Sequence, residues 1–438
     1  MIGFMRFAAL LALGLAAAQD RNTQWREDIA LTRTEFLARD LSYTDAERAQ
    51  ADAALQALAA RVETLSDAEI VAGLAQAAAM ADNAHTRAYI LRNRGMWRRY
   101  PIRIWKFGEE WRVIAAQPAQ AELVGARILS IGGVEIGAAE RAMRPLFAGN
   151  DQWARYMATY TLTSPDALIG MGLMQGDGEA ALDIERDGER RSVTLAPAPF
   201  ERRERPEESW WFLSPAHPAA EGWTHALSET ALPEALQGAA AHYRFERCEG
   251  DIAYLQFNRA QNAPDGETVR DFGARVLQVL ADAPPRMLVV DLRFNTGGDL
   301  SLGAYFIRDV ARSAFAQGPG NVAVIVGPNT FSAGITHVVQ LRQEAPVTLV
   351  GTEPGDVLET WAEGGNVVLP HSGISMHYAN RAHTYSAAPS GVPAELVWLD
   401  LNVENLNPDR AADWTWEAYR AGRDPYLEAA TGAPLRCP

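Results

Sequence analysis

The sequence predicts an α/β protein with three parts: a core built on a mostly parallel sheet, a β-rich module and an N-terminal helical region. From about residue 250 onwards, apolar strand patterns such as "RMLVVDLRF" and "NVAVIVG" alternate with helical patterns. Strands that lack a polar face are typical of a parallel sheet covered by helices on both sides. Upstream, strand patterns paired around tight turns indicate the module, and apolar residues at three- and four-residue steps indicate the helices.

The chain begins with the pattern of a secretory signal peptide. Arg6 is followed by an apolar stretch that ends in the small residues Ala16 to Ala18, a typical cleavage signal. This stretch is shorter than the about 20 apolar residues of a spanning helix. No cysteine lies near the cleavage point to carry a lipid anchor. We expect an exported protein, periplasmic or extracellular, without membrane insertion after signal removal; the alternative is a frayed apolar N-terminus.

The remaining patterns divide the mature chain. "DAALQALAARVETL" and "DAEIVAGLAQAAAM" predict helices with acidic starts, and "PIRIWKFGEEWRVIAA" and "ALDIERDGERRSVTLAP" predict hairpins. Residues 150–175 have a helical pattern, whereas the Pro-rich, charged stretch after residue 198 has no clear periodicity. The expected organisation is a signal peptide (1–18), an N-terminal helical region ending in the His85 segment (19–97), a β-rich module with a helical insert (98–198), a linker (199–245) and the core (246–438).

Composition excludes some partners. The formal net charge of −15 argues against nucleic acid, because phosphate binding needs a basic face, and argues weakly against anionic membranes. Cys248 and Cys437 are the two cysteines, and in an oxidising compartment they could pair or stay as two buried thiols. Their number and spacing do not indicate a metal site, and we expect no metal or cofactor.

Ser332, in "GPNTFSAGIT", is placed between a predicted strand and a predicted helix. Backbone N–H groups at a helix start lack partners and the helix dipole is positive there, which favours a developing negative charge. The position suits a nucleophile. It also suits an ordinary N-cap, a common role for serine, and position alone leaves both open.

A glycine pair follows the preceding buried strand. "DLRFNTGGD" places Gly297 and Gly298 at the end of a strand that should run parallel to the one before Ser332. Glycines allow the backbone to approach a ligand closely, so one of their N–H groups and that of Ala333 could form an oxyanion hole. A plain helix-entry turn is the alternative.

These segments together resemble a known family. "DLRFNTGG" followed by "TFSAG" resembles the core of the C-terminal processing (tail-specific) serine peptidases, including the tricorn-protease core. "DNAHTRAY", "VGARILSIGGVEI" and "AGRDPYLEAA" resemble further segments of that family. The resemblance implies a ClpP/crotonase-like core, a PDZ-like module, Ser332 as nucleophile, and an oxyanion hole from the Gly297 and Gly298 loop with Ala333.

The general base cannot follow the commonest pattern of that family, which is a lysine in a turn downstream of the serine. "GTEPGDVLETWAEGG" has no lysine, and Lys106, the only lysine of the chain, lies on a predicted hairpin far from that position. Arginine stays protonated, so histidine is the natural alternative. The eight candidates are His85, His217, His225, His242, His337, His371, His377 and His383.

The resemblance selects His85. Its position is similar to that of the catalytic histidine in the tricorn-type branch, whereas His337, five residues along the helix from the serine, should point away. The tricorn core has a serine directly before its histidine, and Ala84 stands there instead. An aromatic-x-Glu segment of related exported members is similar to "WAEGG", which makes Glu363 the candidate orienting group. Asp82 and Glu353 are weaker candidates.

The predicted function is an exported serine peptidase acting on proteins or peptides. His85 would deprotonate Ser332, which would form an acyl-enzyme. The PDZ-like module would gate or recruit peptide chains, and a homo-oligomer is compatible with the sequence. One alternative is a degenerate peptidase scaffold that binds peptides or proteins. A crotonase-type acyl-CoA enzyme would share the fold but fits poorly with export and lacks a recognisable CoA site.

Overall fold

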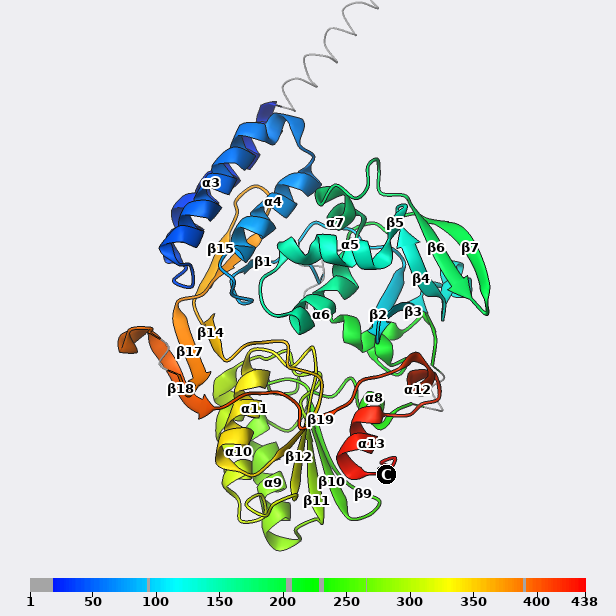
Figure 1. The fold of residues 1–438 in the computed structure, drawn as a ribbon, viewed down its shortest axis with the longest axis vertical. Helices are drawn as coiled ribbons and strands as arrows, with labels where there is room; N and C mark the ends of the chain where they lie inside the picture. The colour runs from blue at the N-terminus through cyan, green and yellow to red at the C-terminus, as the bar shows by residue number, and fades with distance from the viewer. Residues whose placement is uncertain (1–18, 93–94, 202–206, 228–231, 265, 389–390) are drawn as a thin grey trace, which may run out of the picture.

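A computed structural model describes the chain except for residues 1–18, 93–94, 202–206, 228–231, 265 and 389–390. The expected signal peptide lies outside the described residues. Within the described part, no helix is long and apolar enough to cross a membrane. In Figure 1 the parallel sheet occupies the lower half of the molecule, and the N-terminal helices and the β-rich region lie above it.

The lower half is built on a six-stranded sheet in the order β19-β13-β12-β11-β10-β9. β9 pairs antiparallel with β10, and the other neighbours in this sheet pair in parallel. Its strands are β9 (Tyr243–Cys248), β10 (Ile252–Phe257), β11 (Met287–Asp291), β12 (Val322–Val326), β13 (Thr348–Gly351) and β19 (Arg410–Ala411).

Helices cover both faces of this sheet, as the apolar strand patterns predict. Successive residues of each strand alternate between two clusters: Val290 and Val324 belong to one, Val289 and Ile325 to the other. The first cluster also contains residues of α9 (Val269–Asp282), α10 (Leu300–Arg312) and α11 (Ala333–Glu344), and the second contains residues of α13 (Pro425–Thr431). Figure 1 shows these two groups of helices on opposite sides of the strands.

The upper half holds a seven-stranded sheet with the predicted hairpins and helical insert. Its long strands pair antiparallel, and the two-residue strand β8, from the segment predicted as a linker, pairs with β3. The elements are β2 (Ile102–Phe107), β3 (Glu110–Ala116), β4 (Arg127–Ile131), β5 (Val134–Glu135), α5 (Ile136–Met143), α6 (Asp151–Thr161), α7 (Pro165–Gly170), β6 (Ala180–Arg186), β7 (Glu189–Leu195) and β8 (Thr224–His225).

The N-terminal region is helical from residue 19 and contains two helices with complete capping boxes. Thr44 caps α3 and Ser66 caps α4. Each side chain accepts a hydrogen bond from the backbone N–H of the glutamate three residues later, and that glutamate side chain accepts one from the N–H of the capping residue. The elements are a π-turn (Thr32–Phe36), α2 (Leu37–Arg39), α3 (Asp45–Arg61) and α4 (Asp67–Ala79).

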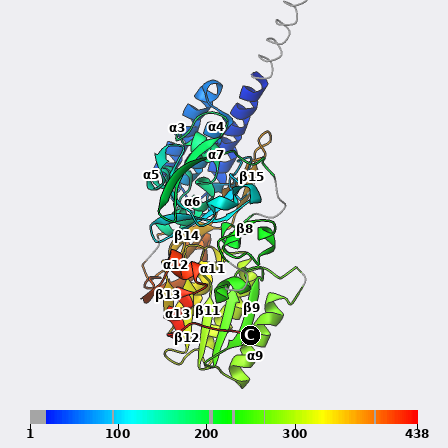
Figure 2. The ribbon, with the colours of Figure 1, turned by 90° about the vertical axis from the view of Figure 1, so that its right-hand side faces the viewer.

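A strand that follows the N-terminal helices pairs with strands from the C-terminal part of the sequence. β1 pairs antiparallel with β16, which also pairs with β15, and a neighbouring sheet has the order β14-β17-β18. These strands are β1 (Arg87–Ala88), β14 (Glu359–Ala362), β15 (Gly365–Val368), β16 (Ser375–Tyr378), β17 (Arg381–Ser386) and β18 (Val397–Val403). In the side view of Figure 2, β15 lies in the upper part of the molecule and β14 near its middle, both above β11 and β12.

The segment predicted as a linker is largely packed. Phe212 and Leu213 are fully buried, and Glu207 is buried between the guanidinium groups of Arg99 and Arg103. Phe212 and Leu213 lie in one short 3₁₀ turn, so they follow no helix or strand period in the sequence. The remaining helices are α8 (Glu234–Gln237) and α12 (Trp416–Arg420).

The predicted mixed α/β class is therefore confirmed, as are the hairpins of the β-rich region. The assignments of a ClpP/crotonase-like core and a PDZ-like module, and the exact domain boundaries, stay predictions.

Cys248 at the end of β9 forms a disulfide with Cys437, which ties the C-terminus to the edge of the parallel sheet. The two cysteines are 189 positions apart in the sequence, so the bond closes a long loop of the unfolded chain. Replacing both by serine should lower the free energy of unfolding by about 2–5 kcal/mol. Urea unfolding with and without dithiothreitol measures this. The reductant should destabilise the wild type and leave the double variant unchanged; equal sensitivity of the two proteins would contradict the linkage.

Candidate active site

Four loops meet at one edge of the parallel sheet, because β10 to β13 are parallel and end on the same side. Residues 258–264 follow β10, residues 292–299 follow β11, residues 327–332 follow β12 and residues 352–358 follow β13. This edge is where open α/β sheets bind their ligands.

Ser332 lies at the start of α11 in a strained backbone conformation. Its φ of 56° and ψ of −125° place a side-chain-bearing residue in a region that costs about 1–3 kcal/mol. The serine occupies the N-cap position, but its side chain makes no capping hydrogen bond. The N-cap alternative therefore does not explain this residue. The strained turn instead leaves the hydroxyl available at the sheet edge.

Of the two glycines, Gly297 lies against the serine and Gly298 against Ala260. A Cβ added to Gly297 would come within 2.6 Å of the Ser332 Cβ, and one added to Gly298 within 2.4 Å of the Ala260 carbonyl oxygen. Both glycines have positive φ, 96° and 142°. Only glycine therefore fits at either position.

The three predicted oxyanion donors are not equivalent. Gly297 donates its N–H to Asn295 Oδ1 at 2.9 Å, so this group is already engaged. Among the described residues, the N–H groups of Gly298 and Ala333 have no hydrogen-bond acceptor. Two free N–H groups beside a serine side chain are what a developing oxyanion requires.

His85 reaches this edge from outside the parallel sheet, on a turn held by its neighbours. Asn83 accepts hydrogen bonds from the Thr360 hydroxyl and the Trp361 N–H of β14, at 3.1 and 3.2 Å. Thr86 donates its hydroxyl to the buried Asp40 at 2.6 Å. Because both residues flank His85, the turn is fixed from two sides.

The His85 ring is stacked, buried and neutral. It lies 4.5 Å from the ring of Phe331, which stacks on its other side against Trp153 of α6 at 3.9 Å. The side chain is 5% exposed, and burial, with a smaller contribution from Arg87, lowers its pKa well below the usual value. The imidazole is therefore a free base near neutral pH, as a general base must be.

The two nitrogens of His85 have different surroundings. Nδ1 lies 3.5 Å from the Thr360 hydroxyl and 4.0 Å from Asp356 Oδ2. Nε2 is buried and has no hydrogen-bond partner among the described residues. An imidazole with a carboxylate on the Nδ1 side and a vacant Nε2 can accept a proton at Nε2.

Asp356 is the carboxylate that connects the histidine and the serine. Its Oδ2 accepts the Ser332 N–H at 3.2 Å, and its loop is held by Asn150, whose Nδ2 donates to the Pro354 and Asp356 carbonyl oxygens at 2.8 and 3.3 Å. Asn150 also caps α6, the helix that carries Trp153. Burial raises the pKa of Asp356 to about 6.

Glu363, the predicted orienting group, is paired elsewhere. Its Oε1 lies 3.2 Å from Nε2 of His383, and its side chain is 43% exposed. The other nitrogen of His383 lies 2.8 Å from the Tyr385 hydroxyl, which bonds Thr336 on α11. The weaker candidates Asp82 and Glu353 are exposed. The carboxylate beside His85 is Asp356 instead.

The remaining candidate bases are engaged or remote. Lys106 donates to both carboxylate oxygens of Glu140 at 3.1 Å within the β-rich region. His337 is buried in α11 against Phe257, and burial lowers its pKa to about 4. Of the described acidic, histidine and cysteine residues, only Glu234, Glu246 and Cys437 are spaced for a metal, and Cys437 is in the disulfide.

The whole fold can be compared with solved structures. A structure of mature CPAF complexed with lactacystin aligns with a TM-score of 0.59 at 13% identity, covering 94% of this chain and 97% of the other. A serine-to-alanine mutant of CPAF aligns with a TM-score of 0.58 at 14% identity, covering 93% and 96%. This chain has the CPAF fold.

Weaker structural matches add no further argument. Structures of the photosystem II D1 C-terminal processing protease and of the tricorn protease each cover 94% of this chain, but at TM-scores of 0.37 and 0.39 and identities of 15% and 13%. The structural neighbours thus include the peptidases that the motifs resemble. No protein-family model and no curated protein matches the sequence.

Sequence reasoning missed Asp356 and the residues that hold the two catalytic loops. Asp356 stands in "PGDV", a short polar turn with no periodic pattern to single it out. Asp356 is buried among residues from distant parts of the chain, including His85, Asn150 and Ser332, which no local pattern encodes. Asn83, two residues before His85, lies in a polar turn, so its residue type gives no signal that separates it from its neighbours.

The contact between Gly297 and Ser332 generates a prediction. Gly297→Ala would force the two Cβ atoms together and displace the serine, so labelling of the protein by a fluorophosphonate should slow about a hundred-fold or more. Gly133→Ala is the matched control, because Gly133 also has a positive φ of 80° but has no atom within 4 Å of an added Cβ. Equal labelling of both variants would show that the contact has no role.

Proposed function

We propose that this protein is an exported serine peptidase that cleaves protein or peptide substrates through an acyl-enzyme on Ser332. The observation that carries the proposal is the meeting of three features at one sheet edge. These are a strained serine, two free N–H groups beside it, and a buried neutral imidazole in contact with the carboxylate that accepts the serine N–H.

In the proposed mechanism, His85 Nε2 takes the proton of the Ser332 hydroxyl as the oxygen attacks the peptide carbonyl carbon. The negative charge moves to the carbonyl oxygen, which accepts hydrogen bonds from the Gly298 and Ala333 N–H groups. The imidazolium then gives its proton to the leaving amine, and the peptide C–N bond breaks. Water, deprotonated by the same histidine, hydrolyses the ester and restores the serine.

Asp356 has the role of orienting and charge-stabilising group in this proposal. Its carboxylate lies on the Nδ1 side of His85 and stabilises the imidazolium as it forms. Glu363 is left with an indirect role through His383 and the Tyr385–Thr336 contact on the nucleophile helix. A degenerate scaffold is disfavoured, because strain at a serine without a capping bond would then have no use.

Export remains part of the proposal. The N-terminal signal pattern motivates it, and the Cys248–Cys437 disulfide supports it, because such bonds persist mainly in oxidising compartments. The β-rich region would influence catalysis directly, since Asn150 and Trp153 of that region contact the Asp356 and Phe331 loops. This supports a gating role for the region.

Removing the nucleophile or base tests the proposal. Ser332→Ala should abolish fluorophosphonate labelling and hydrolysis of an unfolded protein such as casein. His85→Ala should lower kcat by about 10³-fold or more, because it removes the proposed general base. Lys106→Gln is the control for a lysine base and should keep full activity. Labelling that persists in Ser332→Ala, or loss in Lys106→Gln with the fold intact, would refute the assignment.

The pH dependence should report Asp356. Below a pH of about 6 the buried carboxyl is protonated and no longer stabilises the imidazolium; above it the carboxylate is charged while His85 is still neutral. We therefore expect kcat/KM to rise with pH through about 6 and then level off. Asp356→Asn should lower kcat by at least about a hundred-fold and remove this rise. A wild-type profile that is flat between pH 5 and 7 would contradict the role of Asp356.

A further inference from the structure

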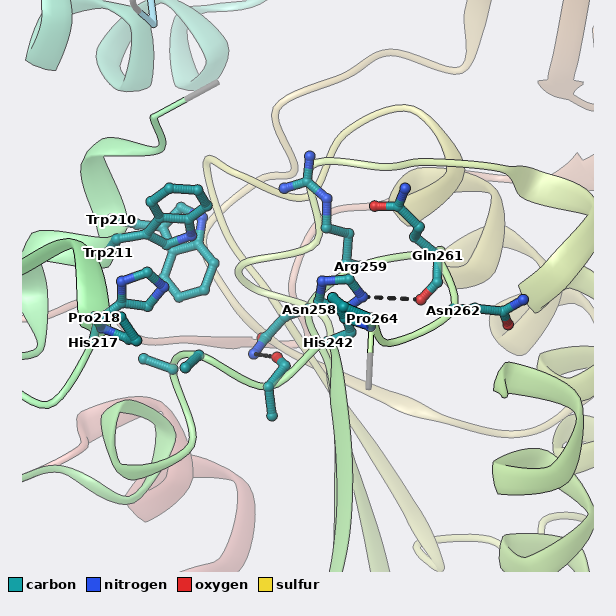
Figure 3. Close-up of a pocket in the computed structure, with 13 residues that line it drawn as sticks. Trp210, Trp211, His217, Pro218, His242, Asn258, Arg259, Gln261, Asn262 and Pro264 are labelled. Atoms are coloured by element: carbon teal, nitrogen blue, oxygen red, sulfur yellow. Dashed lines mark hydrogen bonds between the residues drawn. The ribbon is translucent and has the colours of Figure 1, made fainter. Parts of the chain in front are cut away.

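A cavity of about 610 Å³ lies on the loop that follows β10. Its volume falls in the range of small-ligand sites, about 300–1,000 Å³. Figure 3 shows its two sides, with two tryptophans and a histidine on one and an arginine and a glutamine on the other. The lining residues used below are Trp210, Trp211, His217, Asn258, Arg259 and Gln261.

The cavity adjoins the loop of the proposed oxyanion hole. Ala260, between the lining residues Arg259 and Gln261, donates its N–H to the Gly297 carbonyl at 3.2 Å, and its own carbonyl accepts from Asp299 at 2.8 Å. Gly297 in turn contacts Ser332. The path from the serine to the cavity wall therefore runs from Ser332 to Gly297, from Gly297 to Ala260, and then along one Cα–Cα step of about 3.8 Å. An extended peptide advances about 3.3 Å per residue, so a residue about two or three positions from the cleaved bond would lie here.

The cavity is preformed. The backbone N–H groups of Asn258 and Arg259 both donate to the His242 carbonyl, at 2.8 and 3.1 Å. The Asn258 side chain donates to the Ala241 carbonyl at 3.0 Å, and His242 Nδ1 lies 3.1 Å from the Gln261 carbonyl (Figure 3). These bonds fix the wall in place, so little conformational entropy is lost when a ligand enters.

The opposite wall is aromatic. Trp211 and His217 stack at 4.7 Å with an angle of 15° between their planes, and both are half-buried, so ring surface remains available. Trp210 stacks on Phe294 of the oxyanion loop at 4.5 Å, which joins this wall to the catalytic loops. Burial lowers the pKa of His217 to about 4, so its ring is uncharged at neutral pH. Stacked neutral rings favour an aromatic guest.

The charge beside the cavity indicates which substrate side chains it would repel. Arg259, the only arginine, lysine or acidic residue among the lining residues, lies 3.8 Å from Glu208, which is also paired with Arg92 at 3.2 Å. Glu208 is thus shared between two guanidinium groups and does not fully neutralise Arg259. Lysine and arginine side chains of a substrate would be repelled.

We propose that this cavity binds an uncharged aromatic side chain of the peptide substrate, about two or three residues from the cleaved bond, and disfavours basic side chains there. The proposal rests on the peptidase function proposed above, and it names the substrate preference of the same site.

Kinetics on matched peptides test the preference. A single Phe, Ala or Lys is placed in turn at each position flanking the cleavage point of one host peptide. At one position Phe should raise kcat/KM about tenfold or more over Ala, mainly through KM, and Lys should lower it. Trp211→Ala and His217→Ala should remove the Phe-over-Ala ratio. Trp398→Ala is the matched control, an exposed tryptophan on β18 that should leave the ratio unchanged. The same ratio in all four proteins would overturn the proposal.

A binding experiment separates failure of the cavity from failure of the peptidase function. The Ser332→Ala protein, in which no turnover is required, is titrated with N-acetyl-phenylalaninamide and N-acetyl-alaninamide while the indole N–H signals of ¹⁵N-labelled tryptophan are observed. The phenylalanine probe should shift the Trp211 signal, identified by its loss in Trp211→Ala, and the alanine probe should not. Shifts that are absent or equal for both probes would overturn the cavity proposal whether or not the wild type hydrolyses peptides.

Discussion

The Phe331 ring is the contact on which the candidate site depends. Phe331 directly precedes Ser332, and its two faces stack on His85 from the N-terminal region and on Trp153 from the β-rich region. Three separate parts of the chain therefore meet on one side chain. A shift of the Phe331 loop moves the nucleophile and withdraws the support of the imidazole together, so the two groups cannot be positioned independently.

Burial also sets the protonation states of the two titratable groups beside this ring, His85 and Asp356. His85 and Asp356 are 5% and 4% exposed, and burial disfavours the charged form of each, which lowers one pKa and raises the other. Above a pH of about 6, the resting pair is a neutral imidazole beside a charged carboxylate. The pair becomes an ion pair when a proton leaves the serine, and the field between the two charges acts in the transition state rather than in the resting protein.

The sequence predicts those features that depend on neighbouring residues, which are the secondary-structure elements and their order. Apolar strands, capped helices and tight turns indicate the α/β class, and a serine and glycines at the ends of parallel strands indicate the sheet edge where the loops meet. Asp356 could not be found in this way, because its burial depends on loops far apart in the chain. For the same reason Glu363 was a reasonable choice of carboxylate, although the structure pairs it with His383. The burial of Phe212 could not be predicted either, because the apolar residues around it follow no period and become buried only through tertiary packing.

The short pairing of β1 with β16 has a consequence for biosynthesis. Arg87 faces His377, and the turn with His85 immediately precedes this pairing, so the strand that fixes the turn is made almost three hundred residues later. A nascent chain emerging from the ribosome carries the base long before the alcohol, and neither is in place until β16 has been synthesised. In the proposed peptidase, a chain that ends before β16 would therefore lack an ordered pair of His85 and Ser332.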